Sequence, residues 1–298
     1  MKAALLIGAT ASAMPVLAKG RRHATVVLAI LCIAVLASFI IAGMVGSITL
    51  PLHEILAALR PVARADASLA STLLDLRLTR AASAFVTGAL LALAGVMMQA
   101  LLRNPLADPY VLGVSGGAAV GALGAMLLFS AAWIIDVAAF IGALLVALLL
   151  FWLAHRDLRG GDGFGSGADR SLLLLSGVVM ATGCGALVTL MLSVAPEARL
   201  RGMVFWLIGD LSGTSVRAVP WLVLGAALLF AARSARSINL MAMHAEAAAT
   251  LGVPVGRLRR ALFFCAALLT AAAVSNAGSI GFVGLIDRKS TRLNSSHW

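Results

Sequence analysis

One serine in this chain lies in a pattern found at catalytic sites inside membranes. Gly113, Ser115 and Gly116 form the Gly-x-Ser-Gly arrangement of intramembrane serine proteases. A serine nucleophile needs a general base within hydrogen-bonding reach, and that base is usually a histidine. The histidines outside the C-terminal tail all fall in predicted loops: His23, His53, His155 and His244. The sequence therefore disfavours a protease.

Other reactive groups also argue against an enzyme. The dipeptide Gly-Lys does not occur, which excludes a Walker A phosphate loop and leaves any ATP hydrolysis to another polypeptide. Cys32, Cys184 and Cys265 lie in separate apolar runs, an arrangement typical of buried packing residues and not of a disulfide or metal site. We therefore expect a chain that is not an enzyme and that binds no cofactor or metal.

Ionisable residues are scarce in the apolar runs, which bears on transport driven by an ion gradient. Ion-coupled carriers usually hold charged groups at mid-membrane depth. Asp136 is the one candidate, but it falls near the end of a predicted span, where an acid can reach water. Gln99, near the end of another span, is typical of a residue that hydrogen-bonds between helices. An ion-coupled secondary transporter remains an alternative function.

The composition places these residues in a membrane. The 298 residues are 61% hydrophobic and only 12% charged, with a mean hydropathy of +1.03. A soluble domain carries about 25% charged residues, so too little polar surface is left to face water. Uncharged runs such as Ala81–Leu102 and Tyr110–Ser130 are near the roughly 20 residues that a helix needs to cross a bilayer. Basic cytoplasmic loops explain the formal net charge of +11, so we expect no nucleic-acid partner.

The hydropathy pattern predicts an all-α, polytopic transmembrane helix bundle. Its seven predicted spans are Ala24–Gly46, Ala81–Leu102, Tyr110–Ser130, Ala131–Ala154, Leu172–Ala195, Ala218–Ala232 and Ala261–Ile286. Lys and Arg concentrate in the loops on the side of the N-terminus, such as the loop that holds Arg233, Arg236 and Arg257. By the positive-inside rule, the N-terminus is therefore cytoplasmic.

The two ends of the chain differ from the transmembrane domain predicted over residues 24–286. Residues 1–23 form an N-terminal extension in which Met1–Ala18 imitates a signal peptide, although cleavage there would oppose the charge bias. Residues 287–298 are abruptly polar, and Asp287–His297 can be back-translated into DNA that resembles a sequencing adapter. We therefore predict that 287–298 is a non-native tail and that a native C-terminal segment is missing.

Two further features of the sequence are a regular spacing of small residues in two spans and a short predicted cytoplasmic helix. Residues with small side chains recur every fourth position in two predicted spans, which lets helices approach closely in lipid. They are Gly113, Gly117, Gly121 and Ala125 in the third span, and Gly177, Ala181 and Gly185 in the fifth. Between the last two spans, the sequence predicts a helix over Met241–Leu251 that Gly252 ends, with Pro254 beyond it. That helix is equally compatible with a connector and with a docking element.

Several ordered motifs together resemble one family of membrane proteins. The motifs are Leu76–Arg80, Gly88–Gln99, Arg103–Pro109, Leu112–Ala118, Trp206–Ser212, Glu246–Val253 and Gly278–Ile286. In this order they resemble the FecCD/BtuC family, the permease subunits of ATP-binding-cassette (ABC) importers for iron-siderophores, haem and cobalamin. Thr79 stands where the family's Arg-Leu-Pro-Arg motif has proline.

The resemblance implies the type II ABC importer permease fold, of whose roughly ten spans this chain holds about seven. It also implies a homodimer in membrane lipid, two cytoplasmic ATPase subunits and a periplasmic or extracellular substrate-binding protein. The expected function is import of a ferric-siderophore-like chelate across the bacterial inner membrane, with haem or cobalamin as alternative substrates.

The resemblance further implies roles for individual residues. Arg77 and Arg80 would face outward and meet acidic residues of the binding protein, an arrangement that steers docking. The short cytoplasmic helix would fit a cleft of the ATPase. Its coupling residues would be Met241, His244, Glu246, Leu251 and Gly252. We assign helix packing to Gly88, Gly95, Gly113, Gly117 and Gly121.

Overall fold

The computed structural model describes residues 25–46, 69–129, 131–153, 167–211, 217–243 and 245–280. Within these ranges every regular element is a helix. The chain divides into two compact units, Met1–Ala81 and Ala82–Trp298. The predicted extension 1–23 and the predicted tail 287–298 lie outside the described residues, so both stay predictions.

The first unit contains the helix Thr25–Met44 and the beginning of α3, which runs over Leu69–Leu102. Apolar side chains such as those of Leu28, Ile33 and Ile40 are exposed on the Thr25–Met44 helix. A helix that is apolar all round is suited to lipid and not to water. Near its end, Gly43 is buried, and a Cβ added there would lie 3.6 Å from Leu74 Cδ1.

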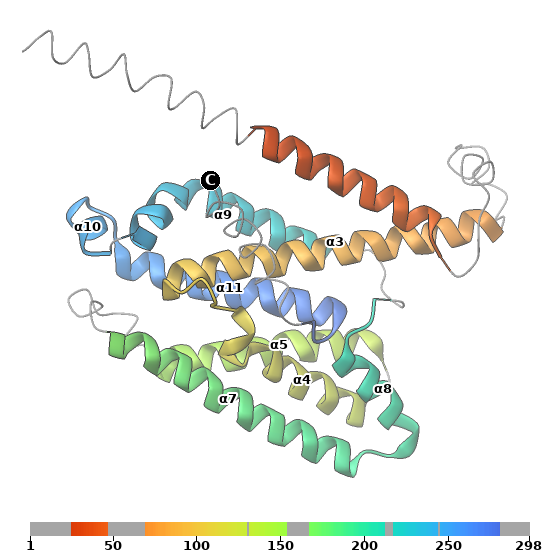
Figure 1. Ribbon diagram of the computed structural model, residues 1–298. Coiled ribbons are helices and arrows are strands. Elements are labelled where there is room, and N and C mark those ends of the chain that lie inside the picture. The colour runs from red at the N-terminus through yellow and green to blue at the C-terminus, as the bar shows by residue number, and fades with distance from the viewer. Residues whose placement is uncertain are drawn as a thin grey trace, which may run out of the picture. The chain divides into compact units, whose positions relative to one another are not determined.

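The second unit contains the rest of α3 and a series of helices that pack around α11 and α5 (Figure 1). In chain order the elements are η2 (Pro109–Leu112), α4 (Val114–Leu128), α5 (Ala132–Leu153), α7 (Gly167–Val194), α8 (Glu197–Ile208), α9 (Ala218–Met243), α10 (Ala245–Thr250) and α11 (Val255–Ala277). Helix α4 packs mainly against α5 and also against α7, while α11 packs against α5, α9 and α4.

Helix α11 supplies much of the core of this unit. Its buried residues are mostly alanines, with Leu262 and Phe263 among the largest fully buried side chains. The rings of Phe151 on α5 and Phe264 on α11 are 4.7 Å apart, and Phe264 meets Phe263 edge to face at 5.5 Å. Aromatic contacts of this geometry add to the van der Waals packing that holds helices together in lipid.

Six described helices are long and apolar enough to cross a membrane. They are Thr25–Met44, Ser71–Leu102, Ala132–Leu153, Leu173–Val194, Ala218–Met243 and Val255–Ala277. The multi-pass membrane architecture expected from the sequence is thereby confirmed. The third predicted span is the exception, because α4 covers only Val114–Leu128 and is shorter than a full span. The preceding residues form the separate 3-10 helix η2 and end at Gly113, which has a φ of +71°.

Three predicted boundaries were wrong for the same physical reason. Helix α3 begins at Leu69 and not at Ala81, helix α9 extends to Met243, and α11 begins at Val255. In each case the helix continues through charged residues, such as Asp75 and Arg77 in α3. Hydropathy identifies only the apolar part of a helix. The backbone hydrogen bonds of the helix do not require apolar side chains, so the helix continues past that part.

The helix predicted over Met241–Leu251 is also divided differently. Met241 belongs to the last turn of α9, and a separate helix, α10, covers Ala245–Thr250. Gly252 ends this segment as the sequence predicts, with a φ of +82° and an N–H that donates to Ala249 O. A positive φ is readily adopted by glycine because it has no Cβ. Pro254 then stands at the N-cap of α11.

Candidate functional site

The predicted packing glycines of α4 lie where that helix approaches its neighbours most closely. A Cβ added to Gly117 would lie 2.5 Å from Gly142 O on α5, and a Cβ added to Gly121 would overlap with Ala138 O. A Cβ added to Gly113 would lie 3.0 Å from Ala181 N on α7. Helix α4 is therefore held against α5 and α7 by backbone contacts that a larger side chain would prevent.

Sequence reasoning missed the partner of these glycines on α5. A Cβ added to Gly142 would overlap with Gly117 O, so the two helices approach each other through glycine on both sides. The signal that could have found it is a stripe of alanines beside Gly142. Ala139, Ala143 and Ala147 recur every fourth residue and are all buried.

Other glycines singled out from the sequence have different surroundings. Gly95 is buried in α3. A Cβ added to Gly88 would meet no atom within 4 Å among the described residues, and the same holds for Gly185 on α7. The small-residue spacing of α7 therefore marks a close contact at Gly177 and Ala181, which face Gly113, but not along the whole helix.

Arg77 stands on α3, and its side chain contacts the C-terminal end of the Thr25–Met44 helix. Its Nη1 donates to the carbonyl oxygen of Gly43 at 3.0 Å and to that of Met44 at 3.4 Å. A Cβ added to Gly46 would overlap with the Arg77 guanidinium. The last carbonyls of a helix lack partners within the helix, and a cation there also suits the helix dipole. Arg77 therefore caps the Thr25–Met44 helix.

Arg80 is placed differently from Arg77, although both stand on α3. Its side chain is exposed, whereas that of Arg77 is partly buried. An exposed guanidinium keeps its donors available for a carboxylate of a partner protein. Of the two arginines predicted to dock a binding protein, Arg80 thus has the more accessible charge.

The predicted coupling residues divide into buried and exposed side chains. Met241 is only 1% exposed and packs in the core of its own unit, whereas Leu251 is 68% exposed. Glu246 lies in the first turn of α10 and is exposed. His244 lies outside the described residues. Of the predicted coupling residues that the structure describes, Glu246, Leu251 and Gly252 are therefore the exposed ones.

A buried polar group lies in the loop between α3 and α4. Asp108 Oδ1 accepts a hydrogen bond of 2.8 Å from the Tyr110 N–H and caps η2. Burial raises the pKa of Asp108, and this effect outweighs the hydrogen bond, which lowers it. The Tyr110 hydroxyl accepts a bond of 3.0 Å from the Ile280 N–H, and burial raises the pKa of that hydroxyl as well. The loop is thereby tied to the end of α11.

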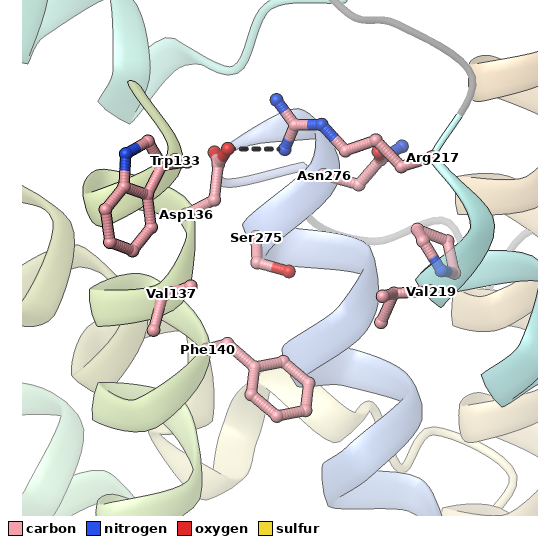
Figure 2. A pocket seen from close by; sticks show the side chains of 9 residues that line it. Trp133, Asp136, Val137, Phe140, Arg217, Val219, Ser275 and Asn276 are labelled. Carbon is pink, nitrogen blue, oxygen red and sulfur yellow. Dashed lines mark ion pairs between the residues drawn. The ribbon is translucent and has the colours of Figure 1, made fainter. Parts of the chain in front are cut away.

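An ion pair that sequence reasoning missed joins α5 to the beginning of α9. Arg217 Nη1 lies 2.7 Å from Asp136 Oδ2 (Figure 2). Asp136 was expected to reach water from the end of its span, and its side chain is 27% exposed. The sequence shows the two charges but not their pairing, because they belong to helices far apart along the chain.

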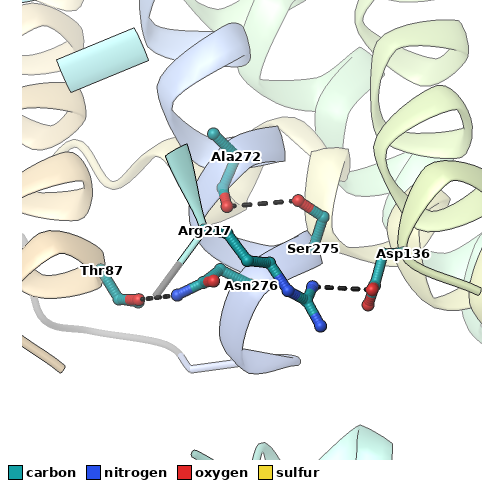
Figure 3. Close-up of polar contacts among 6 residues, drawn as sticks. All are labelled: Thr87, Asp136, Arg217, Ala272, Ser275 and Asn276. Atoms are coloured by element: carbon teal, nitrogen blue, oxygen red, sulfur yellow. Dashed lines mark hydrogen bonds and ion pairs between the residues drawn. The ribbon is translucent and has the colours of Figure 1, made fainter. Parts of the chain in front are cut away.

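Figure 3 shows separate polar contacts near this ion pair, on α11 and α3. Asn276 Nδ2 on α11 donates to Thr87 Oγ1 on α3 at 3.1 Å, and both side chains are buried. Gln99, which the sequence predicts to bond between helices, is also buried in α3. In the described part of the chain, no three His, Cys, Asp or Glu side chains gather closely enough to hold a metal ion.

Comparisons with known proteins agree on one family. Residues 4–293 match the FecCD transport family, and this match extends past both boundaries predicted for the transmembrane domain. The chain is 42% identical over 223 residues to the cobalamin import system permease protein BtuC of Halobacterium salinarum, covering 73% of this chain and 58% of that protein. It is 35% identical over 217 residues to the vitamin B12 import system permease protein BtuC of Escherichia coli K12, covering 71% and 63%.

A solved structure shows the same fold. It is an inward-facing conformation of an ABC transporter described as of the metal-chelate type, with a TM-score of 0.71 and 27% sequence identity. The alignment covers 87% of this chain and 78% of that chain. The type II ABC importer permease fold predicted from the resemblance is therefore confirmed. The chain spans about 60% of the length of the two BtuC relatives. On the family match and these two relatives, the chain belongs to the FecCD transport family.

Proposed function

We propose that this chain is the permease subunit of an ATP-driven importer and forms the substrate path as a homodimer. The observation that carries the proposal is the family match over residues 4–293, together with the six helices among the described residues that are able to span a membrane. A membrane-spanning chain of this family provides a path for a substrate, and the energy for transport comes from elsewhere.

ATP hydrolysis belongs to a separate cytoplasmic subunit under this proposal. The chain lacks the Gly-Lys dipeptide of a phosphate loop, so it does not bind ATP through such a loop. The relatives that it matches are named as permease proteins, and we propose a transport subunit with neither an enzymatic activity nor a cofactor of its own. The surface formed by Glu246, Leu251 and Gly252 is the proposed contact with the ATPase. An exposed leucine and an exposed carboxylate on one short segment provide both an apolar and a polar contact for a partner. Met241 supports this surface from inside the core.

The opposite side receives a substrate-binding protein, and Arg80 provides its main docking charge. Arg77 contributes mainly by holding the end of the Thr25–Met44 helix in place. The N-terminus is cytoplasmic, as the distribution of Lys and Arg favours. The chain lies in the bacterial inner membrane, as the family resemblance implies. This orientation puts the coupling surface in the cytoplasm and the arginines of α3 outside.

The substrate is a metal chelate. The relatives with 42% and 35% identity carry names for cobalamin import, and the solved structure is described as of the metal-chelate type. These names favour cobalamin over the ferric-siderophore-like chelate expected from the sequence, and haem is a further alternative. An ion-coupled carrier is disfavoured because Asp136, the candidate coupling residue, is paired with Arg217.

Uptake by the reconstituted system tests the function. The permease, its ATPase and its binding protein are placed in proteoliposomes, and accumulation of radiolabelled cobalamin, ferric siderophore and haem is measured with internal ATP or without it. We expect accumulation of a metal chelate only with ATP. Accumulation driven by an ion gradient in the absence of ATP would contradict the proposal.

Charge reversal at Arg80 tests the docking surface. Arg80→Glu should lower the affinity of the permease for its binding protein, because reversing an interfacial charge replaces attraction by repulsion and costs several kcal/mol. Arg201→Glu is the matched control, since Arg201 is an exposed arginine on another helix, α8. Affinity is measured with both components in detergent. Equal losses in the two variants would show that Arg80 has no specific docking role.

A further inference from the structure

A cavity lies within the second unit, between three helix ends. Its volume is about 370 Å³, in the range of about 300–1,000 Å³ typical of pockets for small molecules. The first turns of α5, the beginning of α9 and the last turn of α11 form its walls. Its lining residues are Trp133, Asp136, Val137, Phe140, Arg217, Val219, Pro220, Ser275 and Asn276.

The walls of this cavity are apolar, and its charges lie together at one place. Figure 2 shows the Phe140 ring, Val137 and Val219 around the space, with Asp136 and Arg217 on one side of it. A soluble polar molecule would find few hydrogen-bond partners along such walls, whereas a hydrocarbon chain is well matched to them. The cavity therefore suits a molecule with one apolar part and one charged part.

The polar groups deeper in the cavity already have partners. Ser275 Oγ donates to Ala272 O at 3.2 Å, and the Asn276 amide nitrogen donates to Thr87 Oγ1 (Figure 3). The remaining binding capacity is at the ion pair. Only one nitrogen of Arg217 and one oxygen of Asp136 take part in the 2.7 Å contact, although a guanidinium has five N–H donors and a carboxylate two oxygens. Both side chains are also partly exposed, at 32% and 27%.

The position of the cavity along the membrane normal follows from the helix ends. Asp136 and Trp133 are at the start of a spanning helix, Arg217 directly precedes another, and Asn276 lies in the last turn of a third. The ends of spanning helices lie at the level of the lipid headgroups. Trp133 is 69% exposed, and tryptophan is enriched at that level. The charges thus face headgroups and the apolar walls face acyl chains.

We propose that this cavity binds a zwitterionic phospholipid with a primary amine, of the phosphatidylethanolamine type. The phosphate accepts hydrogen bonds from the free donors of Arg217, and the ammonium donates to the unpaired oxygen of Asp136. An acyl chain occupies the space beside Val137 and Phe140. An anionic lipid without the amine would bring its negative charge close to the Asp136 carboxylate and gain nothing from it. The proposal concerns a lipid, and not the transported substrate or a partner subunit.

Native mass spectrometry of the purified permease tests this inference. The protein is given an equimolar mixture of phosphatidylethanolamine and phosphatidylglycerol with the same acyl chains, and the bound lipids are counted. The wild type should retain phosphatidylethanolamine in preference. Asp136→Asn should lose this preference by about tenfold, and Arg217→Gln should lose both lipids, because hydrogen bonds to charged groups are being removed.

Two further variants separate binding from folding. Arg201→Gln removes an exposed arginine on α8 that lies over the Phe205 ring and is not among the lining residues of the cavity, so lipid preference should be unchanged. Val137→Phe fills the cavity while leaving the ion pair in place, and it should reduce retention of the lipid. Thermal unfolding in detergent identifies any variant that has lost its fold.

Three results would overturn the inference. They are equal retention of the two lipids by the wild type, an unchanged preference in Asp136→Asn, and an unchanged retention in folded Val137→Phe. A competition experiment with glycerophosphoethanolamine, the soluble headgroup without acyl chains, could give a fourth contradicting result. If it displaces the lipid at equal concentration, the cavity recognises a free zwitterion and the acyl chain is not part of the ligand.

Discussion

The contact between α4 and α5 makes a quantitative prediction about Gly117. A Cβ in Gly117→Ala would lie 2.5 Å both from Gly142 O and from Val146 Cγ2. Carbon atoms pack best at about 3.5–4.0 Å, so the two helices would have to separate by about 1 Å. Overpacking of this kind costs about 1–3 kcal/mol. The intrinsic helix preference of alanine over glycine offsets up to about 1 kcal/mol of this destabilisation.

A matched variant removes the helix-preference term from the comparison. Gly225→Ala makes the same change inside α9, where an added Cβ meets no described atom within 4 Å. Its unfolding free energy should rise slightly, and the difference between the two variants should equal the packing cost of about 1–3 kcal/mol. In thermal unfolding in detergent this corresponds to roughly 2–10 °C. If Gly117→Ala is as stable as Gly225→Ala, the helices are not held by this glycine contact and the reasoning fails.

Two other contacts give predictions of the same kind. Arg199 donates from α8 to the carbonyls of Met126 and Leu127 at the end of α4, so Arg199→Leu should lower the unfolding free energy by about 1–3 kcal/mol in thermal unfolding. An unchanged stability would show that water satisfies these carbonyls equally well. Burial raises the pKa of Asp108, so its contribution to stability is present at low pH and is lost as the pH rises through the ordinary value to the raised one. Asp108→Asn, which keeps an acceptor for the Tyr110 N–H, should remove this dependence from unfolding measured across pH, and its persistence would assign it to another group.

The number and approximate position of most spanning helices could be predicted because they depend on the hydropathy of consecutive residues. Apolar residues in runs of about 20 predict a spanning helix whatever surrounds them. Small residues every fourth position predict close helix contacts, as found at Gly117 and Gly121. Gly252 ends its segment for a local reason, its positive φ. The family was accessible for a similar reason, since its motifs are ordered along the chain and do not depend on the fold.

Contacts between distant residues could not be predicted in this way. Helix α7 has small residues at the same spacing as α4, yet a Cβ added to Gly185 would meet no described atom within 4 Å. A periodic pattern shows that a helix has a small-residue face but not which helix covers that face. The ion pair between Asp136 and Arg217 and the hydrogen bond between Asn276 and Thr87 could not be predicted for the same reason. Each depends on which helix ends meet, and the sequence contains that information only through the whole fold.

Arg77 and Arg80 show how such a contact changes the meaning of a motif. Three residues apart on one helix, they lie near the same face and carry the same charge, and the family resemblance implies the same outward role for both. The structure gives Arg77 two backbone carbonyls at the end of the Thr25–Met44 helix, while Arg80 remains exposed. A guanidinium that holds a helix end is less able to follow a partner protein as it docks. Under the proposed function, Arg77 therefore holds the end of the Thr25–Met44 helix, and Arg80 is the arginine whose exposed charge would meet a binding protein.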